Sequence, residues 1–127
     1  MLDFNRQKDS VGAVRVIEDN LIIADTASLR AAMHMLKASG RGLVCVVDQQ
    51  RKVVGVLSDG DIRNALLEND NMDDCVAGYM TQDFSYAVEG VSKEQVLKLL
   101  DGRVKQIPIL DNQGQLVTIT GIGYNYL

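Results

Sequence analysis

Apolar and polar positions follow one another along the chain in an order that occurs twice. Between residues 29 and 36 apolar side chains recur three and four positions apart, which predicts an amphipathic helix. Two apolar runs follow at 43–47 and 53–57 with a polar turn between them, and near-continuous apolar runs are typical of strands covered on both faces. Helix, strand, turn and strand return in the same order from residue 92 onward. The pattern therefore predicts an internal repeat of a mixed α/β unit.

The two copies align at a constant offset along the sequence. Asp48 falls on Asp111, an offset of 63 residues, and the apolar runs beside them stay in register. We expect one copy at 11–71 and the other at 72–127, with residues 72–82 forming a short helix and an extended segment that join them. A unit of roughly sixty residues is small for independent stability, so we expect the two copies to share a core.

Helix ends are marked by residues that favour caps. Thr26 or Ser28 can cap the first helix, and Gly40 suits its C-terminal turn. Ser92 followed by Gln95 matches the spacing of a capping box at the start of the corresponding helix in the second copy. The apolar faces predicted for three helices are Leu29, Ala32, Met33 and Leu36; Ile62, Ala65 and Leu66; and Val96, Leu99 and Leu100.

Composition places the chain among globular proteins. It has 127 residues, of which 46% are hydrophobic and 24% charged. Its apolar runs are only a few residues long, whereas a membrane-spanning helix needs about 20, and the polar N-terminus lacks the apolar stretch of a signal peptide. We therefore expect a cytoplasmic protein that does not enter a membrane. A net charge of -4 does not favour nucleic acid as a partner, because phosphates attract a basic surface.

The sequence offers little for catalysis or for a metal. Cys45 lies in an apolar run and Cys75 in a predicted helix, without paired spacing, so both are expected to be free buried thiols. With His34 as the single histidine, neither a Cys/His metal site nor a Ser-His-Asp set is favoured, and no P-loop pattern occurs. We expect no catalytic residue, no metal and no cofactor.

One turn concentrates polar side chains. The second strand of the first copy runs directly into Ser58-Asp59-Gly60-Asp61, and a helical pattern begins at Ile62. Serine and aspartate before a helix are common caps, and Asp59 alone can serve in this way. Asp59 and Asp61 can also hold magnesium, although paired acids at a helix start more often act as caps. A ligand site is the remaining alternative.

The same four residues suit the sugar and the phosphate of a nucleotide. The start of a helix presents unpaired backbone N–H groups and a partial positive charge, which favour phosphate. Ser58 can add a hydroxyl donor to that anion, and the Asp61 carboxylate can accept hydrogen bonds from both ribose hydroxyls. Gly60 leaves room for a ligand to approach the backbone. Capping and nucleotide binding can coexist at this turn.

Together with the repeat, three stretches of sequence resemble a tandem pair of cystathionine-β-synthase (CBS) domains, the regulatory arrangement called a Bateman module. They are VVD…VVGVLSDGDI, QIPILDNQGQLV and YMTQD, and the resemblance covers about residues 11–123. The family's marker is a glycine, two apolar residues, Ser or Thr, two variable positions and Asp, and it is matched from Gly55 to Asp61. The resemblance implies an α/β (α+β) fold of two β-α-β-β-α repeats packed about a pseudo-twofold, with the second repeat truncated at Leu127.

The resemblance also implies an adenosine-type ligand such as AMP or ATP, or another nucleotide, in a cleft that the second repeat completes. The completing segments are Ser85-Tyr86-Ala87 and Val104-Lys105-Gln106, where Tyr86 can pack against a base and Lys105 can meet a phosphate. A solvated surface is the alternative for both side chains. The implied nucleotide site comprises Ser58, Asp59, Gly60, Asp61, Tyr86, Lys105 and Gln106.

In the second repeat the marker is broken. Thr118, Gly121 and Tyr124 replace its glycine, its serine and its aspartate, so no carboxylate remains to hold a ribose. We expect one nucleotide site per chain. The complementary cleft, with Ile23-Ala24 and Arg41-Gly42, is expected to be empty or to bind something else.

The variant SDGDIR is similar to CBS pairs that precede sugar-nucleotidyltransferase domains, so we expect an excised N-terminal regulatory part of such an enzyme, with no activity of its own. CBS pairs commonly form flat dimers, and the last helix of the first repeat offers apolar surface for a homodimer through Ile62, Ala65, Leu66 and Leu67. The alternative function is a ligand-free dimerisation scaffold. Unfolding midpoints measured with different nucleotides separate the two, because only a true ligand raises them.

Overall fold

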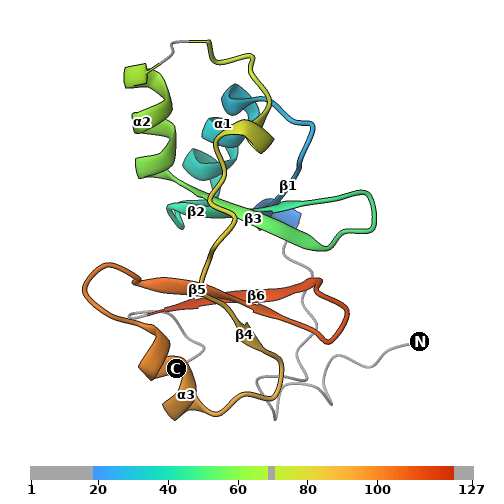
Figure 1. Cartoon of the computed structure of the whole chain (residues 1–127), viewed down its shortest axis with the longest axis vertical. Helices are drawn as coiled ribbons and strands as arrows, with labels where there is room; N and C mark the ends of the chain where they lie inside the picture. Colours follow the sequence, from blue (N-terminus) through green and yellow to red (C-terminus); the bar gives the residue numbers. More distant parts are fainter. Residues whose placement is uncertain (1–18, 69–70, 122–127) are drawn as a thin grey trace. The chain divides into compact units, whose positions relative to one another are not determined.

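The computed structural model describes residues 19–68 and 71–121 (Figure 1). These residues divide into two compact units, 19–84 and 85–121, which are described one at a time. Each unit combines a three-stranded sheet with at least one helix, which confirms the expected α+β fold class. Tyr124, which was assigned to the broken marker, lies outside the described residues.

The first unit is built on the sheet β1-β2-β3. Strand β1 runs parallel to β2, and β2 runs antiparallel to β3. The helices α1 and α2 lie on one side of this sheet (Figure 1). The two apolar runs of the first copy form β2 and β3, as predicted. The elements of the unit are η3 (Asp19–Leu21), β1 (Ile22–Ala24), α1 (Leu29–Ser39), β2 (Leu43–Val47), β3 (Val53–Ser58), α2 (Asp59–Glu68) and η4 (Val76–Gly78).

The second unit repeats this sheet and its turn. Its strands follow the order β4-β5-β6, paired first parallel and then antiparallel. In the first unit Asp48 Oδ1 accepts the backbone N–H groups two and four residues later, at 2.9 and 3.0 Å. Asp111 Oδ1 does the same in the second unit, at 2.9 Å in both bonds, which confirms the repeat. The elements are β4 (Ala87–Val88), α3 (Lys93–Leu99), β5 (Gln106–Leu110) and β6 (Leu116–Gly121).

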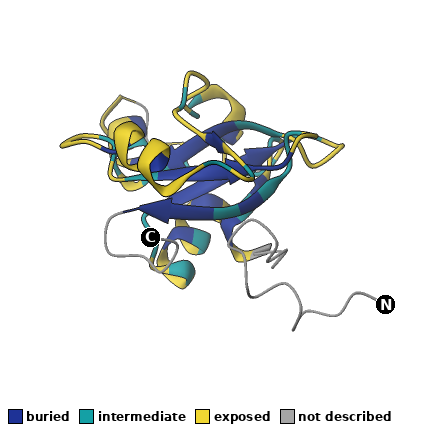
Figure 2. Cartoon of the chain, turned by 90° about the horizontal axis from the view of Figure 1, so that it is seen from below, coloured by how far each residue is buried: buried dark blue, intermediate teal, exposed yellow. Residues whose placement is uncertain are grey.

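Helix burial follows the predicted faces with three exceptions. Figure 2 shows that buried residues concentrate on the strands and on one side of the helices. Met33, Leu66 and Leu99 are 38%, 38% and 37% exposed, so the prediction that they are buried is wrong. Met33 and Leu66 each follow a buried helix residue, and one step along a helix rotates the side chain by about 100° away from the core. Leu99 is the last residue of α3. Leu100 is buried as the C-cap of α3, and the buried helix positions are Leu29, Ala32 and Leu36, Ile62 and Ala65, and Val96.

The helix caps form as the sequence predicts. Ser28 is the N-cap of α1, and its hydroxyl accepts an N–H of the first turn at 3.1 Å. Gly40 ends the helix in the left-handed conformation, with φ 67. Ser92 and Gln95 form the capping box of α3, with hydrogen bonds of 3.1 and 3.4 Å. Thr26, the alternative cap of the first helix, is not used.

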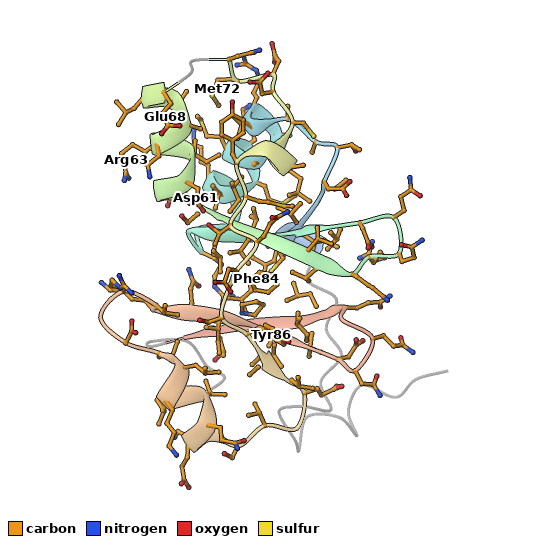
Figure 3. The ribbon with its side chains drawn as sticks, viewed as in Figure 1. Asp61, Arg63, Glu68, Met72, Phe84 and Tyr86 are labelled. Atoms are coloured by element: carbon orange, nitrogen blue, oxygen red, sulfur yellow. The ribbon has the colours of Figure 1, made fainter. Side chains whose placement is uncertain are left out.

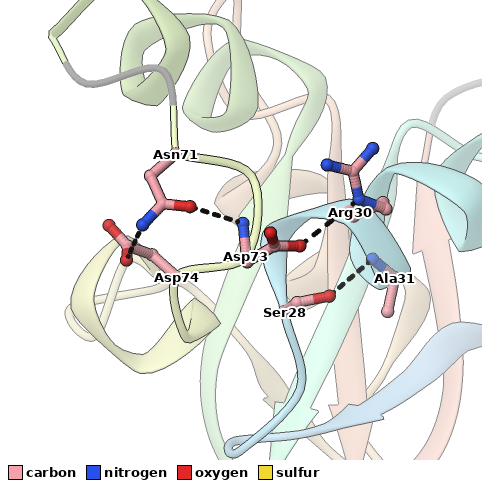
Figure 4. A network of polar contacts seen from close by, with 6 residues as sticks. All are labelled: Ser28, Arg30, Ala31, Asn71, Asp73 and Asp74. Carbon is pink, nitrogen blue, oxygen red and sulfur yellow. Dashed lines mark hydrogen bonds and ion pairs between the residues drawn. The ribbon is translucent and has the colours of Figure 1, made fainter.

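Residues 71–78, which include Met72 (Figure 3), follow α2 and return to the start of α1. The first two N–H groups of α1 donate to the carbonyl groups of Asp74 and Met72, both at 2.9 Å. A helix start otherwise leaves these donors unpaired. Arg30 Nε also lies 3.4 Å from Asp73 Oδ1, and Figure 4 shows this ion pair beside the cap of α1. The returning segment therefore completes the N-terminus of α1.

The short helix predicted in the joining segment is η4, a single 3-10 turn. Val76 in this turn is fully buried in the core of the first unit, and its N–H donates to the carbonyl of Ala27 at 2.8 Å. The compact unit extends to Phe84. Residues 71–84 are thus packed as part of the first unit.

The two cysteines differ in their surroundings. Cys45 is buried in β2, and burial raises the pKa of its thiol to about 12. Cys75 is exposed at the start of η4, where its Sγ lies 2.8 Å from the carbonyl oxygen of Asp25. The prediction of a free buried thiol is confirmed for Cys45. For Cys75 the prediction of burial is wrong, because the residue precedes a surface turn instead of lying inside a packed helix.

Candidate functional site

Ser58 and Asp61 hold each other across the first turn of α2. Ser58 Oγ accepts the N–H of Asp61 at 3.1 Å, and Asp61 Oδ2 accepts the N–H of Ser58 at 2.9 Å. This reciprocal pair is a capping box in which aspartate takes the place that glutamate or glutamine usually holds. It fixes both half-buried side chains at the point where β3 ends and α2 begins.

Asp59 does not provide the cap of α2. Its side chain is exposed and takes no part in the two bonds of the capping box. Its backbone N–H lies 3.4 Å from the carbonyl oxygen of Gly42. The interpretation of Asp59 as the cap is therefore wrong. The missed signal is the Ser-x-x-Asp spacing at this turn, which equals the spacing that identifies Ser92 and Gln95.

The Asp61 carboxylate keeps acceptor capacity for a ligand. A carboxylate offers about four lone-pair sites. Oδ2 uses one of them for Ser58, and Oδ1 lies 3.5 Å from the hydroxyl oxygen of Thr81. Figure 3 shows Asp61 at the start of α2, where the helix dipole favours a negative charge. Two ribose hydroxyls can therefore still be accepted by this side chain.

Gly60 is unobstructed from within the first unit. A Cβ added there would have Ser58 Oγ as its near neighbour, at 3.6 Å, which is an ordinary contact. Gly60 is also helical, so its backbone conformation is open to any residue. Neither packing nor conformation in this unit requires glycine, which fits the prediction that a ligand approaches the backbone at this point.

Gly55, the first residue of the marker, is explained by packing. A Cβ added there would lie 2.8 Å from Met80 Cγ, closer than side chains approach in real structures. Met80 belongs to the segment that pairs with β3 through an antiparallel bridge between Val56 and Thr81. Glycine at position 55 lets this segment lie directly against the strand.

Three predicted site residues lie in the second unit. Tyr86 stands directly before β4 and is 49% exposed, while Lys105 stands directly before β5 and is exposed. Gln106 begins β5 and pairs with Gly121. Solvent reaches the side chains of Tyr86 and Lys105. That these residues complete one site with the Ser58–Asp61 turn of the first unit stays a prediction.

Gly121 stands in the second repeat where the first repeat has Ser58, and it is still inside β6. A Cβ added at Gly121 would contact the carbonyl oxygen of Lys105 and lie 2.7 Å from Gln106 Cβ. The close pairing of β5 and β6 therefore leaves no room for a serine side chain at this position. Thr118 also lies within β6. The expectation of one nucleotide site per chain stays a prediction.

Two features of ranges 19–68 and 71–121 concern metal clusters and membrane-spanning helices. No group of three or more His, Cys, Asp or Glu side chains there is arranged to hold a metal ion. His34 is exposed on α1. None of the helices in these ranges is long and apolar enough to cross a membrane. The chemistry that the site offers comes from hydroxyl, carboxylate and backbone groups.

Residues 11–68 match the family described as CBS domain. This part of the chain therefore carries a CBS domain. The matched range covers the whole of β1, α1, β2, β3 and α2, so the Ser58–Asp61 turn lies inside a CBS domain. The resemblance identified from the sequence is thereby confirmed.

Curated relatives of this CBS-domain chain are longer than the chain itself. A 17.7 kDa protein from the bps2 3' region of Acidianus ambivalens is 30% identical over 110 residues, which cover 86% of this chain and 63% of that protein. Arabinose 5-phosphate isomerase GutQ of Escherichia coli is 37% identical over 100 residues, which cover 74% of this chain and 30% of the isomerase. The chain therefore spans less than two thirds of either relative.

Solved structures show the same fold over most of the chain. CBSX2 from Arabidopsis thaliana, solved in complex with AMP, is 25% identical with a TM-score of 0.72, and the match covers 90% of each chain. The CBS domain pair of MJ0100, solved in complex with 5'-methylthioadenosine and S-adenosyl-L-methionine, is 22% identical with a TM-score of 0.69. That match covers 80% of this chain and 83% of the other. The fold of the chain is that of a CBS pair.

Proposed function

We propose that the chain is a non-catalytic regulatory module that binds an adenosine-type nucleotide, such as AMP or ATP, between its two CBS repeats. The observation that carries this proposal is the turn from Ser58 to Asp61, where a capping box fixes a hydroxyl and a carboxylate at a helix start and leaves acceptor sites open. The complexes of CBSX2 with AMP and of MJ0100 with 5'-methylthioadenosine support an adenosine-type ligand.

Each part of the nucleotide has a proposed partner. The ribose hydroxyls donate to Asp61, and the phosphate lies at the start of α2 near Ser58. The base packs against Tyr86. Lys105, which lies in the second repeat next to Gln106, contacts a phosphate of the nucleotide. The exposure of Tyr86 and Lys105 supports these roles, because solvent reaches both side chains.

The test is a calorimetric titration of the full chain with AMP, ATP, GMP and CMP, together with thermal unfolding. A ligand present at about 100 times its Kd raises the free energy of unfolding by about 2.7 kcal/mol. Asp61→Asn keeps an acceptor oxygen for the N–H of Ser58 but presents an amide to the ribose. We expect this variant to lose roughly 2–3 kcal/mol of binding, a thirty- to hundredfold weaker affinity, because two charge-assisted hydrogen bonds are weakened.

Asp59→Asn is the matched control, because it removes the same charge from the same helix start. The Asp59 side chain is exposed and outside the capping box. Its loss should change affinity by less than about fivefold, the range of a surface charge near a helix end. Equal losses in both variants would assign the effect to charge alone and move the ribose away from Asp61. A wild-type chain that binds none of the nucleotides would favour the ligand-free scaffold.

The protein that the module regulates is also part of the proposal. The SDGDIR variant favours a cytoplasmic sugar-nucleotidyltransferase with the module at its N-terminus. The match to arabinose 5-phosphate isomerase, of which this chain spans 30%, supports a module attached to an enzyme of sugar phosphates. Neither nucleic acid nor a membrane is proposed as a partner.

A homodimer through α2 is the proposed assembly. Ile62 and Ala65 are used by the core, whereas Leu67 is 80% exposed and Leu66 is 38% exposed. Large apolar side chains that the core does not cover are typical of association surfaces. Sedimentation at micromolar concentration should give a dimer, and Leu67→Lys should shift it toward monomer because a charge would enter the contact. A wild-type monomer at that concentration would contradict the assembly.

A further inference from the structure

The segment that leads into the second unit, residues 79–84, is fastened to β3 beside the Ser58–Asp61 turn; it is called the connector below. The N–H of Val56 donates to the carbonyl of Thr81 at 3.0 Å, and the N–H of Thr81 donates to the carbonyl of Val56 at 2.8 Å. The preceding residue, Met80, packs over Gly55. The connector is therefore joined to β3 by a single antiparallel bridge at Val56, two residues before Ser58.

The side chain of Thr81 reaches the same carboxylate that is proposed to hold the ribose. Its Oγ1 lies 3.5 Å from Asp61 Oδ1, while Asp61 Oδ2 accepts the N–H of Ser58 at 2.9 Å. One oxygen of Asp61 thus faces the helix cap, and the other faces the connector. Thr81 itself is exposed, so the core does not account for its hydroxyl.

We infer that Thr81 is a positioning residue, which orients the Asp61 carboxylate for the ribose and couples nucleotide binding to the connector. This inference rests on the proposed nucleotide site. A ribose held by Asp61 favours the arrangement in which Ser58 and Thr81 fix the carboxylate, and so favours pairing of the connector with β3. Coupling is reciprocal, so release of the connector from β3 lowers the affinity for the nucleotide by the same factor. The chain passes from the connector into the second unit at Ser85, so the connector is where binding is transmitted.

The test compares Thr81→Val, which removes the hydroxyl and keeps the shape, with Thr81→Ser, which keeps the hydroxyl. Calorimetric titration of the full chain with AMP should show a loss of about three- to tenfold in Thr81→Val, the factor of one hydrogen bond to a carboxylate in a partly exposed site. The preference for AMP over 2'-deoxyAMP should narrow by a similar factor, because the carboxylate is no longer oriented for the sugar. Thr81→Ser should restore both. Thr26→Val, an exposed threonine before α1, is the control and should match wild type.

Amide hydrogen exchange supplies a measure that a merely structural role would not move. In the wild type, AMP should slow exchange at the Thr81 N–H, which is bonded to Val56. In Thr81→Val, saturating AMP should slow amide exchange at the start of α2 but not in the connector. In the ligand-free chain, Asp61→Ala should speed exchange at the Thr81 N–H by about three- to tenfold.

The outcomes separate this inference from the proposed function. If the wild type binds AMP but Thr81→Val leaves its affinity, sugar preference and connector exchange unchanged, the coupling is overturned and the nucleotide site stands. If no nucleotide binds, the proposed function fails. The coupling between Asp61 and the connector is then tested by hydrogen exchange in the ligand-free wild type and Asp61→Ala. Faster exchange at Thr81 in Asp61→Ala then supports a coupled site for another ligand, and unchanged exchange overturns the coupling as well.

Discussion

Arg51 and Gly114 hold the same position in the two turns of the repeat, between β2 and β3 and between β5 and β6. Arg51 has φ 64 and Gly114 has φ 81. This conformation costs an L-residue about 1–2 kcal/mol, whereas glycine adopts it readily. The turn imposes it, because the N–H of each residue donates to the carbonyl of the aspartate three positions earlier, at 2.9 and 3.1 Å. The first unit therefore tolerates a strain that the second unit avoids.

Gly114→Ala tests this account of the turn. We expect the free energy of unfolding to fall by about 1 kcal/mol, because alanine carries the strain that glycine escapes. Gly102→Ala is the matched control, since its φ lies outside the left-handed region and no atom stands within 4 Å of an added Cβ. That variant should be neutral or stabilised by up to about 1 kcal/mol. Urea unfolding measures the free energy of unfolding of both variants. Equal changes in the two would show that the positive φ of Gly114 is not the cause.

Among the elements, β3 depends on a contact that is distant in sequence. Its glycine, Gly55, lies under Met80, which arrives after α2 and η4. Gly55→Ala would push the added Cβ to within 2.8 Å of Met80 Cγ. We expect the free energy of unfolding to fall by about 1–3 kcal/mol, the usual cost of overpacking. Chemical unfolding measures it, with Gly78→Ala as the control because nothing lies within 4 Å of its added Cβ. A loss of stability as large in Gly78→Ala would contradict this explanation.

Elements whose signal is local are the ones that the sequence predicts well. The strands β2, β3, β5 and β6 follow from apolar runs, and the capping box of α3 follows from the spacing of Ser92 and Gln95. Two errors come from a local signal that was misinterpreted, since Met33 lies at the edge of its apolar stripe and the cap of α2 is formed by Ser58 and Asp61 instead of Asp59. Contacts that only the folded chain creates cannot be predicted in this way. The contact of Thr81 with Asp61 joins residues 20 positions apart, and no periodicity in the sequence reports it.

At the scale of the whole molecule, the repeat of the sequence and the compact units of the structure divide the chain at different places. The second copy of the sequence begins near residue 72, yet the first compact unit extends to Phe84. Residues 71–84 cap α1, place Val76 in the core and pair with β3. The first repeat therefore needs the segment that follows it in order to be complete.

Residues 1–84 should consequently fold better than residues 1–70. The added segment accepts the first two N–H groups of α1, both at 2.9 Å, and buries Val76 fully. Two hydrogen bonds of about 1 kcal/mol each and a buried valine of about 1.5–3 kcal/mol approach the 3–5 kcal/mol that a small core supplies in total. Urea titrations followed by circular dichroism should give a cooperative transition for 1–84 and a broad one, or none, for 1–70. Both fragments lack the second unit, so their difference reports the segment alone. Equal midpoints and slopes would mean that the first repeat is stable without residues 71–84.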